Sequence, residues 1–105
     1  MELGEFYPCL KVQDIEQSIR FYQKLGFRLI DDHRDENWAI LQHTNMALSL
    51  YQGHIDENLI NFRGGDIAAI VREAAAQGLA FSQPATQEAD GSWSAEIRDP
   101  DGNWL

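Results

Sequence analysis

The sequence contains little cysteine and no long apolar run. Its single cysteine, Cys9, cannot form an internal disulfide, which favours a reducing compartment. No apolar run approaches the roughly 18 residues that suggest a membrane span. The first residues are acidic and polar, unlike a secretory signal. We therefore expect a cytoplasmic protein without a membrane partner, in which Cys9 lies in an apolar strand.

Basic residues are also scarce. The chain has 8 Lys and Arg against 17 Asp and Glu, a formal net charge of −9. This balance argues against nucleic acid and anionic membranes as partners, and it would attract a cationic ligand. No low-complexity tract or Pro/Ser/Gly linker divides the 105 residues, so one domain is expected. A chain this short has a modest core, which subunit pairing would help to cover.

The first half of the sequence predicts a strand and then a helix. In the strand, residues 6–12, alternation places Tyr7, Cys9 and Lys11 on one face. Asp14 is a favourable N-cap for the helix, and Gly26 suits the left-handed position at its end. The apolar stripe of this helix is Ile15, Ile19 and Tyr22, with Phe21 and Leu25 as further candidates. Strands are expected next at residues 27–31, 38–43 and 46–51, with a turn at Thr44–Asn45 and a connector at 53–58.

The pattern then restarts. A strand at residues 59–62 precedes a helix that Asp66 caps and Gly78 ends. The stripe of this second helix is Ile67, Ile70, Val71, Ala74 and Ala75. Strands are expected at 79–82 and 92–98, followed by a turn at residues 99–102. The second cap and stop lie 52 positions after the first pair, a period that indicates a repeated supersecondary unit.

The fold class predicted from this repeat is α+β. Two βαβββ modules, residues 1–53 and 54–105, would form curved mixed sheets around a cleft, with the helices outside. The second module would lack most of its final strand, because little sequence follows Asn103. An open sheet edge invites pairing, so we expect a homodimer.

Two segments resemble a known superfamily. Residues 10–22, LKVQDIEQSIRFY, with the following Leu25–Gly26–Phe27, resemble the opening of a vicinal oxygen chelate module, and residues 99–103, DPDGN, resemble the signature near its last strand. The superfamily includes glyoxalase I, extradiol dioxygenases, fosfomycin-resistance enzymes and bleomycin-resistance proteins. The resemblance implies the fold, whereas one scaffold hosts many chemistries.

The resemblance also implies a divalent metal held on inner strand faces, but the matching positions do not suit one. The first-strand His falls at Tyr7, the fourth-strand Glu at Ser49 and the fifth-strand ligand at Leu59. A slip of one residue would put Asn58 or Ile60 at the last of these. The eighth-strand position lies beyond Leu105. A bound metal needs about three or four protein ligands, so we expect no metal and no cofactor. His33, His43 and His54 are interpreted as exposed or turn histidines.

Side chains that could line a ligand pocket remain. Aromatic walls stack on planar ligands or hold cations over their faces, and Arg98 or Lys11 could meet an anionic group. The candidate ligand-binding residues are Tyr7, Cys9, Lys11, Trp38, Ser49, Tyr51, Trp93 and Arg98. No phosphate loop, nucleophile elbow or base partner for Cys9 is present, so no catalytic residue is assigned.

Three functions stay open from the sequence. The first is a metal-free binding protein of the bleomycin-resistance type, which sequesters a hydrophobic or cationic small molecule in a cleft. The second is a metal-dependent enzyme of the glyoxalase or dioxygenase class with displaced ligands. The third is a non-catalytic interaction module whose own side chains fill the pocket. The lack of metal-binding residues at the expected positions favours the first function. Whether the protein is an enzyme stays open, and the sequence favours a protein that is not one.

Overall fold

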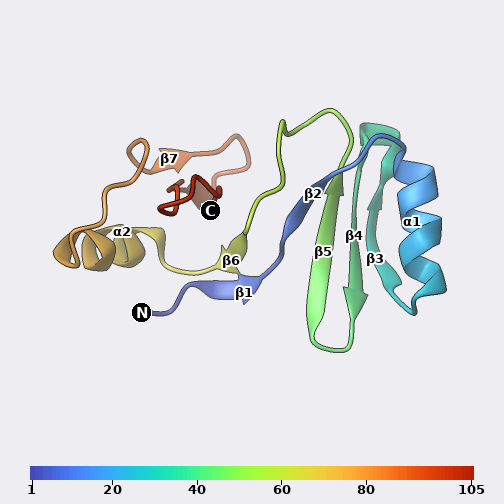
Figure 1. Ribbon diagram of the computed structural model, residues 1–105, viewed down its shortest axis with the longest axis horizontal. Coiled ribbons are helices and arrows are strands. Elements are labelled where there is room, and N and C mark those ends of the chain that lie inside the picture. Colours follow the sequence, from blue (N-terminus) through green and yellow to red (C-terminus); the bar gives the residue numbers. More distant parts are fainter. The chain divides into compact units, whose positions relative to one another are not determined.

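A computed structural model describes all of residues 1–105 and shows a mixed α+β fold (Figure 1). The chain divides into two compact units, residues 6–61 and residues 1–5 with 62–105. Neither helix is long and apolar enough to cross a membrane. The elements in chain order are β1 (Gly4–Phe6), β2 (Cys9–Lys11), α1 (Ile15–Lys24), β3 (Arg28–His33), the 3₁₀ turn η1 (Arg34–Glu36), β4 (Trp38–His43), β5 (Met46–Tyr51), β6 (Phe62–Gly64), α2 (Ile67–Ala76), β7 (Thr86–Gln87) and β8 (Trp93–Ser94).

The unit of residues 6–61 contains one four-stranded mixed sheet in the order β2-β5-β4-β3. β2 runs parallel to β5, whereas β4 is antiparallel to both of its neighbours. With α1 between β2 and β3, this order is a βαβββ module, as the sequence predicted. The strands expected at 38–43 and 46–51 form at those residues, and the β3 strand runs two residues beyond the predicted end. The buried apolar side chains of β4 and β5 explain why these two strands are the longest pairing in the sheet.

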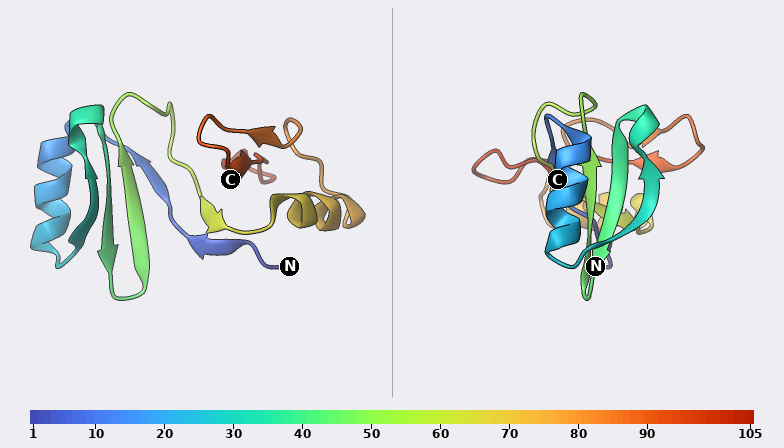
Figure 2. Two further views of the ribbon diagram at one scale, coloured as in Figure 1. Left: turned by 180° about the vertical axis from the view of Figure 1, so that it is seen from behind. Right: turned by 90° about the vertical axis from the view of Figure 1, so that its right-hand side faces the viewer.

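Helix α1 lies along one face of this sheet (Figures 1 and 2). Asp14 caps it as predicted, because its side chain accepts a hydrogen bond from the amide of Gln17. The chain turns away from the helix at Gly26, whose φ of 98° is a left-handed value that a side chain would strain. Both ends of the predicted helix are therefore confirmed.

The core between α1 and the sheet consists of Ile15, Ile19, Ala39, Leu41 and Leu50. Burying each of the large aliphatic side chains contributes about 1.5–3 kcal/mol. The predicted helix stripe is correct for Ile15, Ile19 and the partly buried Tyr22. It is wrong for Phe21 and Leu25, which are exposed. Phe21 follows the buried Ile19 by two residues, which turns it to the other side of the helix, and Leu25 is the C-cap residue after the helix.

The predicted first strand, residues 6–12, is interrupted. β1 ends at Phe6 and β2 begins at Cys9, with Tyr7 and Pro8 between them. Pro8 has no amide hydrogen to give to a neighbouring strand. The amides of Tyr7 and Cys9 still donate to the carbonyls of Asn61 and Leu59, both at 2.8 Å, so the segment 59–61 lies antiparallel to it.

The other unit contains α2 and three short strand pairings. Asp66 caps α2 through the amide of Ala69, and Gly78 has a φ of 85° after its end. The two ten-residue helices therefore begin and end 52 positions apart, as the repeat predicted. In the predicted stripe of α2, Ala74 is buried and Ala75 is exposed.

The strands of this unit are shorter than predicted. The strand expected at 59–62 forms as a bridge at Leu59 and as β6 from Phe62, residues 79–82 form no strand, and only Trp93–Ser94 of the expected 92–98 is a strand. The hydrogen bond from the Ser82 amide to the Glu96 carbonyl, at 2.9 Å, is a remnant of the expected pairing. Polar and small residues between 82 and 96 provide little apolar surface with which to hold longer strands together. The turn at 99–102 is confirmed by the hydrogen bond from the Gly102 amide to the Asp99 carbonyl.

Candidate functional site

The sheet face opposite α1 contains the candidate site. Because side chains alternate along strands, the register that pairs Cys9 with Ser49 and Ser49 with Ile40 puts these three side chains on one face. All three are buried, with at most 5% of each residue exposed. The Ser49 amide donates to the Pro8 carbonyl at 3.0 Å, which fixes β5 against the start of β2. The centre of this face is therefore small, uncharged and closed to solvent.

An aromatic row crosses the same face at one end of the sheet. We use this name for His33, Trp38, Tyr51 and His54. The His33 and Trp38 rings are stacked, with centroids 4.1 Å apart and planes at 11°. Trp38 and Tyr51 lie 6.2 Å apart at 22°, and His54 meets Tyr51 edge-on at 5.8 Å. The row offers adjacent π-faces at which a flat or cationic group can bind.

The pairing of three strands produces the aromatic row. β3 places His33 opposite Trp38, and β5 places Tyr51 opposite Trp38 on its other side. The register of β3 shifts between Leu29 and Asp31, a β-bulge at Ile30. One extra residue exchanges the two faces of a strand. Without it, His33 would point to the helix side and the row would lose its first ring.

Polar groups fix the outer members of the row. His33 Nε2 lies 2.6 Å from Asp31 Oδ1, which orients the imidazole over Trp38. His54 Nε2 lies 2.8 Å from the Glu36 carbonyl oxygen. These contacts hold the histidine rings in place, so the row is preorganised.

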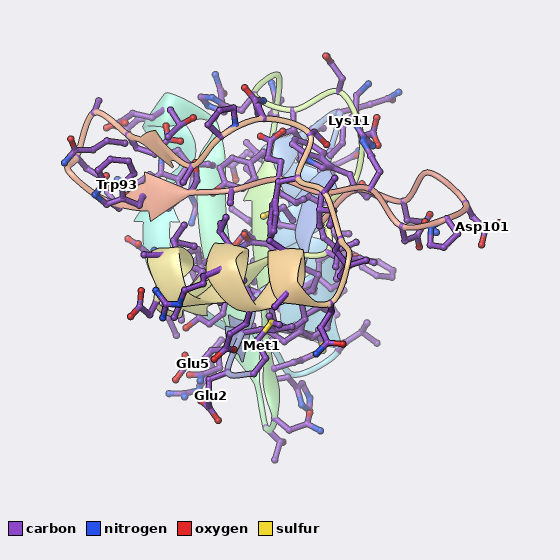
Figure 3. All side chains as sticks on the ribbon, turned by 90° about the vertical axis from the view of Figure 1, so that its left-hand side faces the viewer. Met1, Glu2, Glu5, Lys11, Trp93 and Asp101 are labelled. Atoms are coloured by element: carbon purple, nitrogen blue, oxygen red, sulfur yellow. The ribbon has the colours of Figure 1, made fainter.

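Lys11 lies beside the aromatic row. It is paired with Tyr51 across the parallel β2–β5 register. Its Nζ donates to the Asp56 carbonyl at 3.3 Å, in the connector after β5. Figure 3 labels Lys11 near this connector. The site therefore has one cation within reach of the same face.

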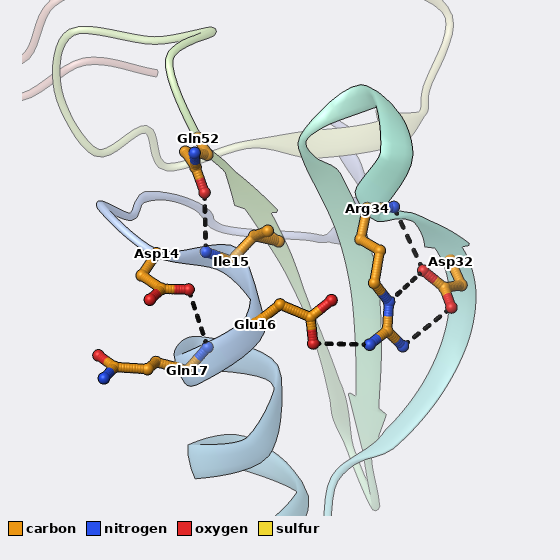
Figure 4. A network of polar contacts seen from close by, with 7 residues as sticks. All are labelled: Asp14, Ile15, Glu16, Gln17, Asp32, Arg34 and Gln52. Carbon is orange, nitrogen blue, oxygen red and sulfur yellow. Dashed lines mark hydrogen bonds and ion pairs between the residues drawn. The ribbon is translucent and has the colours of Figure 1, made fainter.

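A network of ion pairs joins the end of β3 to α1 (Figure 4). Arg34 binds the Asp32 carboxylate through two nitrogens, each at 2.9 Å, and its Nη1 donates to Glu16 Oε2 at 3.0 Å. The hydrogen bonds from Arg34 lower the pKa of the Asp32 carboxyl below its ordinary value of 3.8. Gln52, directly after Tyr51, accepts a hydrogen bond from the Ile15 amide at 2.9 Å. The segments that carry His33 and Tyr51 are thus tied to the same helix.

The predicted site residues fall into two groups. Cys9, Lys11, Trp38, Ser49 and Tyr51 share the face opposite α1, and the half-buried Tyr7 precedes them at the break between β1 and β2.

Trp93 and Arg98 belong to the other unit. Trp93 lies on β8 and is 54% exposed (Figure 3). Arg98 has its guanidinium carbon 5.4 Å from the centre of the Trp104 ring, and its Nη1 donates to the Gly102 carbonyl at 3.3 Å.

Sequence reasoning missed the histidines of the row. His33 lies in a strand and is half-buried, so its interpretation as an exposed or turn residue was wrong. A bulge has no clear sequence signal in this strand, and simple alternation assigns Asp32 and not His33 to the face. His54 is exposed, as expected, but its ring still contacts Tyr51. The only available signal was the closeness of His54 to Tyr51 in the chain.

The residues at the positions that the resemblance assigns to metal ligands do not fit a metal. Tyr7, Ser49 and Leu59 provide a phenol, a hydroxyl and an aliphatic group, where a divalent ion prefers imidazole and carboxylate ligands. Ser49 is in register with Cys9, and Leu59 bridges to Cys9 from the other side, so the aliphatic side chain stands where a ligand would be needed. No group of three His, Cys, Asp or Glu side chains elsewhere in the chain could hold an ion.

Comparison with known proteins identifies the family. The model of the Glyoxalase/Bleomycin resistance protein/Dioxygenase superfamily matches residues 7–105. A bleomycin resistance protein from Klebsiella pneumoniae is 28% identical over 111 aligned residues, which cover 93% of this chain and 86% of that protein.

Solved structures agree on the fold. A superfamily member from Vibrio splendidus 12B01 gives a TM-score of 0.69 at 18% identity, with 95% of this chain and 93% of the other covered. A Legionella pneumophila protein described as an NAD-dependent benzaldehyde dehydrogenase gives a TM-score of 0.77 at 21% identity. The match covers 95% of this chain and 94% of the other. At these identities the likeness concerns the fold alone. The family match over residues 7–105 shows that this chain belongs to the glyoxalase/bleomycin resistance protein/dioxygenase superfamily.

Proposed function

We propose that this protein binds a planar apolar or cationic small molecule at the aromatic row and does not transform it. The observation that carries the proposal is the stacked arrangement of His33, Trp38 and Tyr51, whose planes are within 22° of their neighbours. A flat ligand can extend such a stack without moving the rings, and a positive charge gains from the electron-rich faces. The net charge of −9 attracts a cation over longer distances.

The position of the ligand on the face follows from burial. Cys9, Ile40 and Ser49 are closed to solvent, whereas Trp38 and Tyr51 are partly exposed. The ligand therefore sits on the aromatic row at the end of the sheet rather than over the centre, where the family's enzymes hold their metal. The absence of metal-binding groups at Tyr7, Ser49 and Leu59 supports binding without a metal or another cofactor.

The named relative supports the same class. The protein from Klebsiella pneumoniae, which aligns over most of both chains, is a bleomycin resistance protein. We therefore propose sequestration in the cytoplasm as the biological role, with bleomycin as the first ligand to test. Nine large hydrophobic side chains are at least 38% exposed, which supports a homodimer that covers part of this surface. Multi-angle light scattering that gives the mass of a single chain at micromolar concentration would contradict the dimer.

The test is a calorimetric titration of bleomycin into the wild-type protein and two variants. Trp38→Leu removes the central ring of the row, and we expect at least a tenfold loss of affinity because both stacking surfaces disappear. Trp93→Leu, the same substitution at an exposed ring on β8 of the other unit, should bind as the wild type does. Equal affinity of all three proteins would refute the aromatic row as the site. Methylglyoxal–glutathione turnover by the protein supplied with Ni²⁺ or Zn²⁺ would refute the non-catalytic role.

One observation favours a second function. The centre of the face is filled by Cys9, Ile40 and Ser49, which is the arrangement expected of an interaction module without a ligand pocket. Under this alternative, neither bleomycin nor other planar cations would bind, and Trp38→Leu would change stability only. The same titration therefore separates the two functions.

A further inference from the structure

A second candidate site lies outside the sheet face, in a groove of about 620 Å³ between α1 and the edge of β2. All of its lining residues belong to the unit of residues 6–61. None of the four residues of the aromatic row lines it. A groove of this volume is within the range of small-molecule sites, and neither the family match nor the proposed function uses it.

The groove is basic although the protein is acidic. Lys11, Arg20 and Lys24 line it, three of the 8 Lys and Arg in the chain, and no Asp or Glu lines it. The ion pairs at His33 and Arg34 involve none of the groove's three cations, and no Asp or Glu of the groove faces them. The groove therefore concentrates unpaired positive charge within a net charge of −9.

Arg20 and Lys24 stand one turn apart on the same side of α1. Like charges at this spacing repel each other and destabilise a helix. The one acidic residue of the helix, Glu16, stands one turn before Arg20, but it is paired with Arg34 at 3.0 Å and does not line the groove. An anion between Arg20 and Lys24 would reduce the repulsion between these two side chains.

The groove also has an exposed aromatic wall. Phe21 is 59% exposed and lies between the two cations in the sequence. Its ring meets Tyr22 edge-on, with centroids 5.2 Å apart and planes at 88°, so the edge contact leaves a ring face free. Gln17 and Asn58 add neutral polar groups to the lining. The groove therefore pairs an apolar platform with positive charge.

We propose that this groove binds an organic anion that carries a flat apolar group. The acidic part of the ligand lies between Arg20 and Lys24, and the flat part lies on Phe21. Charge complementarity supports this class of ligand, since the lining holds three cations and no carboxylate. The aromatic row would instead take a cation, so the two sites differ in the sign of the charge they select.

The test uses 8-anilinonaphthalene-1-sulfonate, a sulfonate on a flat apolar ring system, as a fluorescent probe. We expect saturable binding of one probe per chain at the groove, weakened at least fivefold by Arg20→Gln combined with Lys24→Gln and by Phe21→Ala. Rising NaCl should weaken it as well. Arg72→Gln, an exposed arginine on α2 outside the groove, should leave the affinity unchanged. The uncharged N-phenyl-1-naphthylamine should bind more weakly than the sulfonate.

Several outcomes would overturn the proposal. Groove variants that bind the probe as well as the wild type would place the probe elsewhere, and equal binding of the uncharged analogue would remove the role of the cations. A change from dimer to monomer in the double variant would make the groove an interface with a second copy. Trp38→Leu should leave probe binding unchanged, so a failure of the aromatic row and a failure of the groove are separate results. Circular dichroism of each variant checks that α1 still forms.

Discussion

The two units share their helix signals but differ in how much of their surface is buried. Every buried residue of the protein except Ala74 lies within residues 6–61. The strands β3, β4 and β5 there have six residues each, whereas β7 and β8 in the other unit have two each. The same cap and stop residues, repeated 52 positions apart, therefore produced two similar helices, whereas the strand pairings of the two units differ greatly.

The difference shows which signals act locally. An Asp cap and a Gly stop satisfy the ends of a helix from within the same turn, so they work in either unit. A strand gains its stability from side chains on its neighbours. β4 and β5 contain Ala39, Leu41, Leu48 and Leu50, all buried, whereas residues 86–94 contain only Ala and Trp93 as apolar residues.

The largest expected effect on stability comes from removing a core side chain of the first unit, residues 6–61. Leu41→Ala should lower the free energy of unfolding by about 2–5 kcal/mol, because Leu41 is 0% exposed between α1 and the sheet. Leu79→Ala in the other unit should change it by about 0.5 kcal/mol or less, since Leu79 is 54% exposed. Urea unfolding followed by circular dichroism measures both. Equal losses would mean that the second unit has a core comparable to the first.

A smaller effect is expected at the helix caps. Asp14→Ala should lower the free energy of unfolding by about 1 kcal/mol, because it leaves the Gln17 amide without its acceptor. Asp66→Ala removes the equivalent hydrogen bond from the Ala69 amide and should destabilise helix α2 by a similar amount. Asn at either position should restore most of the loss, since its side chain also accepts this bond.

The readouts of the two cap variants should differ. Helix α1 packs on the buried core, so the Asp14 variant should lower the midpoint of global unfolding. Helix α2 contributes one buried residue, so the Asp66 variant should increase local hydrogen exchange in residues 67–76 more than it lowers that midpoint. An equal shift of the global midpoint by both variants would show that the units unfold together.

The sequence allowed prediction where a signal is local or strictly periodic. The caps at Asp14 and Asp66 and the strands at 38–43 and 46–51 were correct, because cap chemistry and apolar runs bounded by a turn leave few alternatives. The exposure of Phe21 was missed, although its position two residues after Ile19 turns it to the other side of the helix. The strand at 79–82 was wrong because its pairing depends on distant residues.

In the candidate site, too, only the residues placed by regular alternation could be predicted. Alternation correctly grouped Cys9 with Lys11 and Ser49 with Tyr51, and the register between strands brought the two pairs to one face. His33 could not be assigned, because the bulge at Ile30 reverses the alternation within its strand. The missed residue is therefore the one whose position depends on an irregularity of pairing rather than on its own neighbours.

The smallest expected effect concerns two surface carboxylates, one in each unit. Hydrogen bonds from Arg34 lower the pKa of Asp32, and hydrogen bonds from Asn103 lower the pKa of Asp99, both from 3.8. A carboxyl whose pKa is lowered by folding stabilises the folded state above its unfolded pKa of about 3.9. That contribution is lost as the pH falls through the lower pKa of the folded state. Both contributions are therefore present at neutral pH and lost only in acid below about pH 4.

Carboxyl ¹³C NMR titrations can separate the two sites. Arg34→Gln should return the pKa of Asp32 toward 3.8 and leave that of Asp99 unchanged, because the Asp99 carboxylate accepts its bonds from Asn103 and Asp101. Asn103→Ala should raise the pKa of Asp99 only in part, since the backbone amide of residue 103 still donates to it at 2.8 Å. The first unit holds its carboxylate mainly with a long side chain and the second partly with its own backbone. A full return of the Asp99 pKa to 3.8 in the Asn103→Ala variant would mean that the side-chain amide of Asn103 alone holds this carboxylate. The Asp99 carboxylate would then depend on a side-chain contact as strongly as the Asp32 carboxylate, at the end of β3, depends on Arg34.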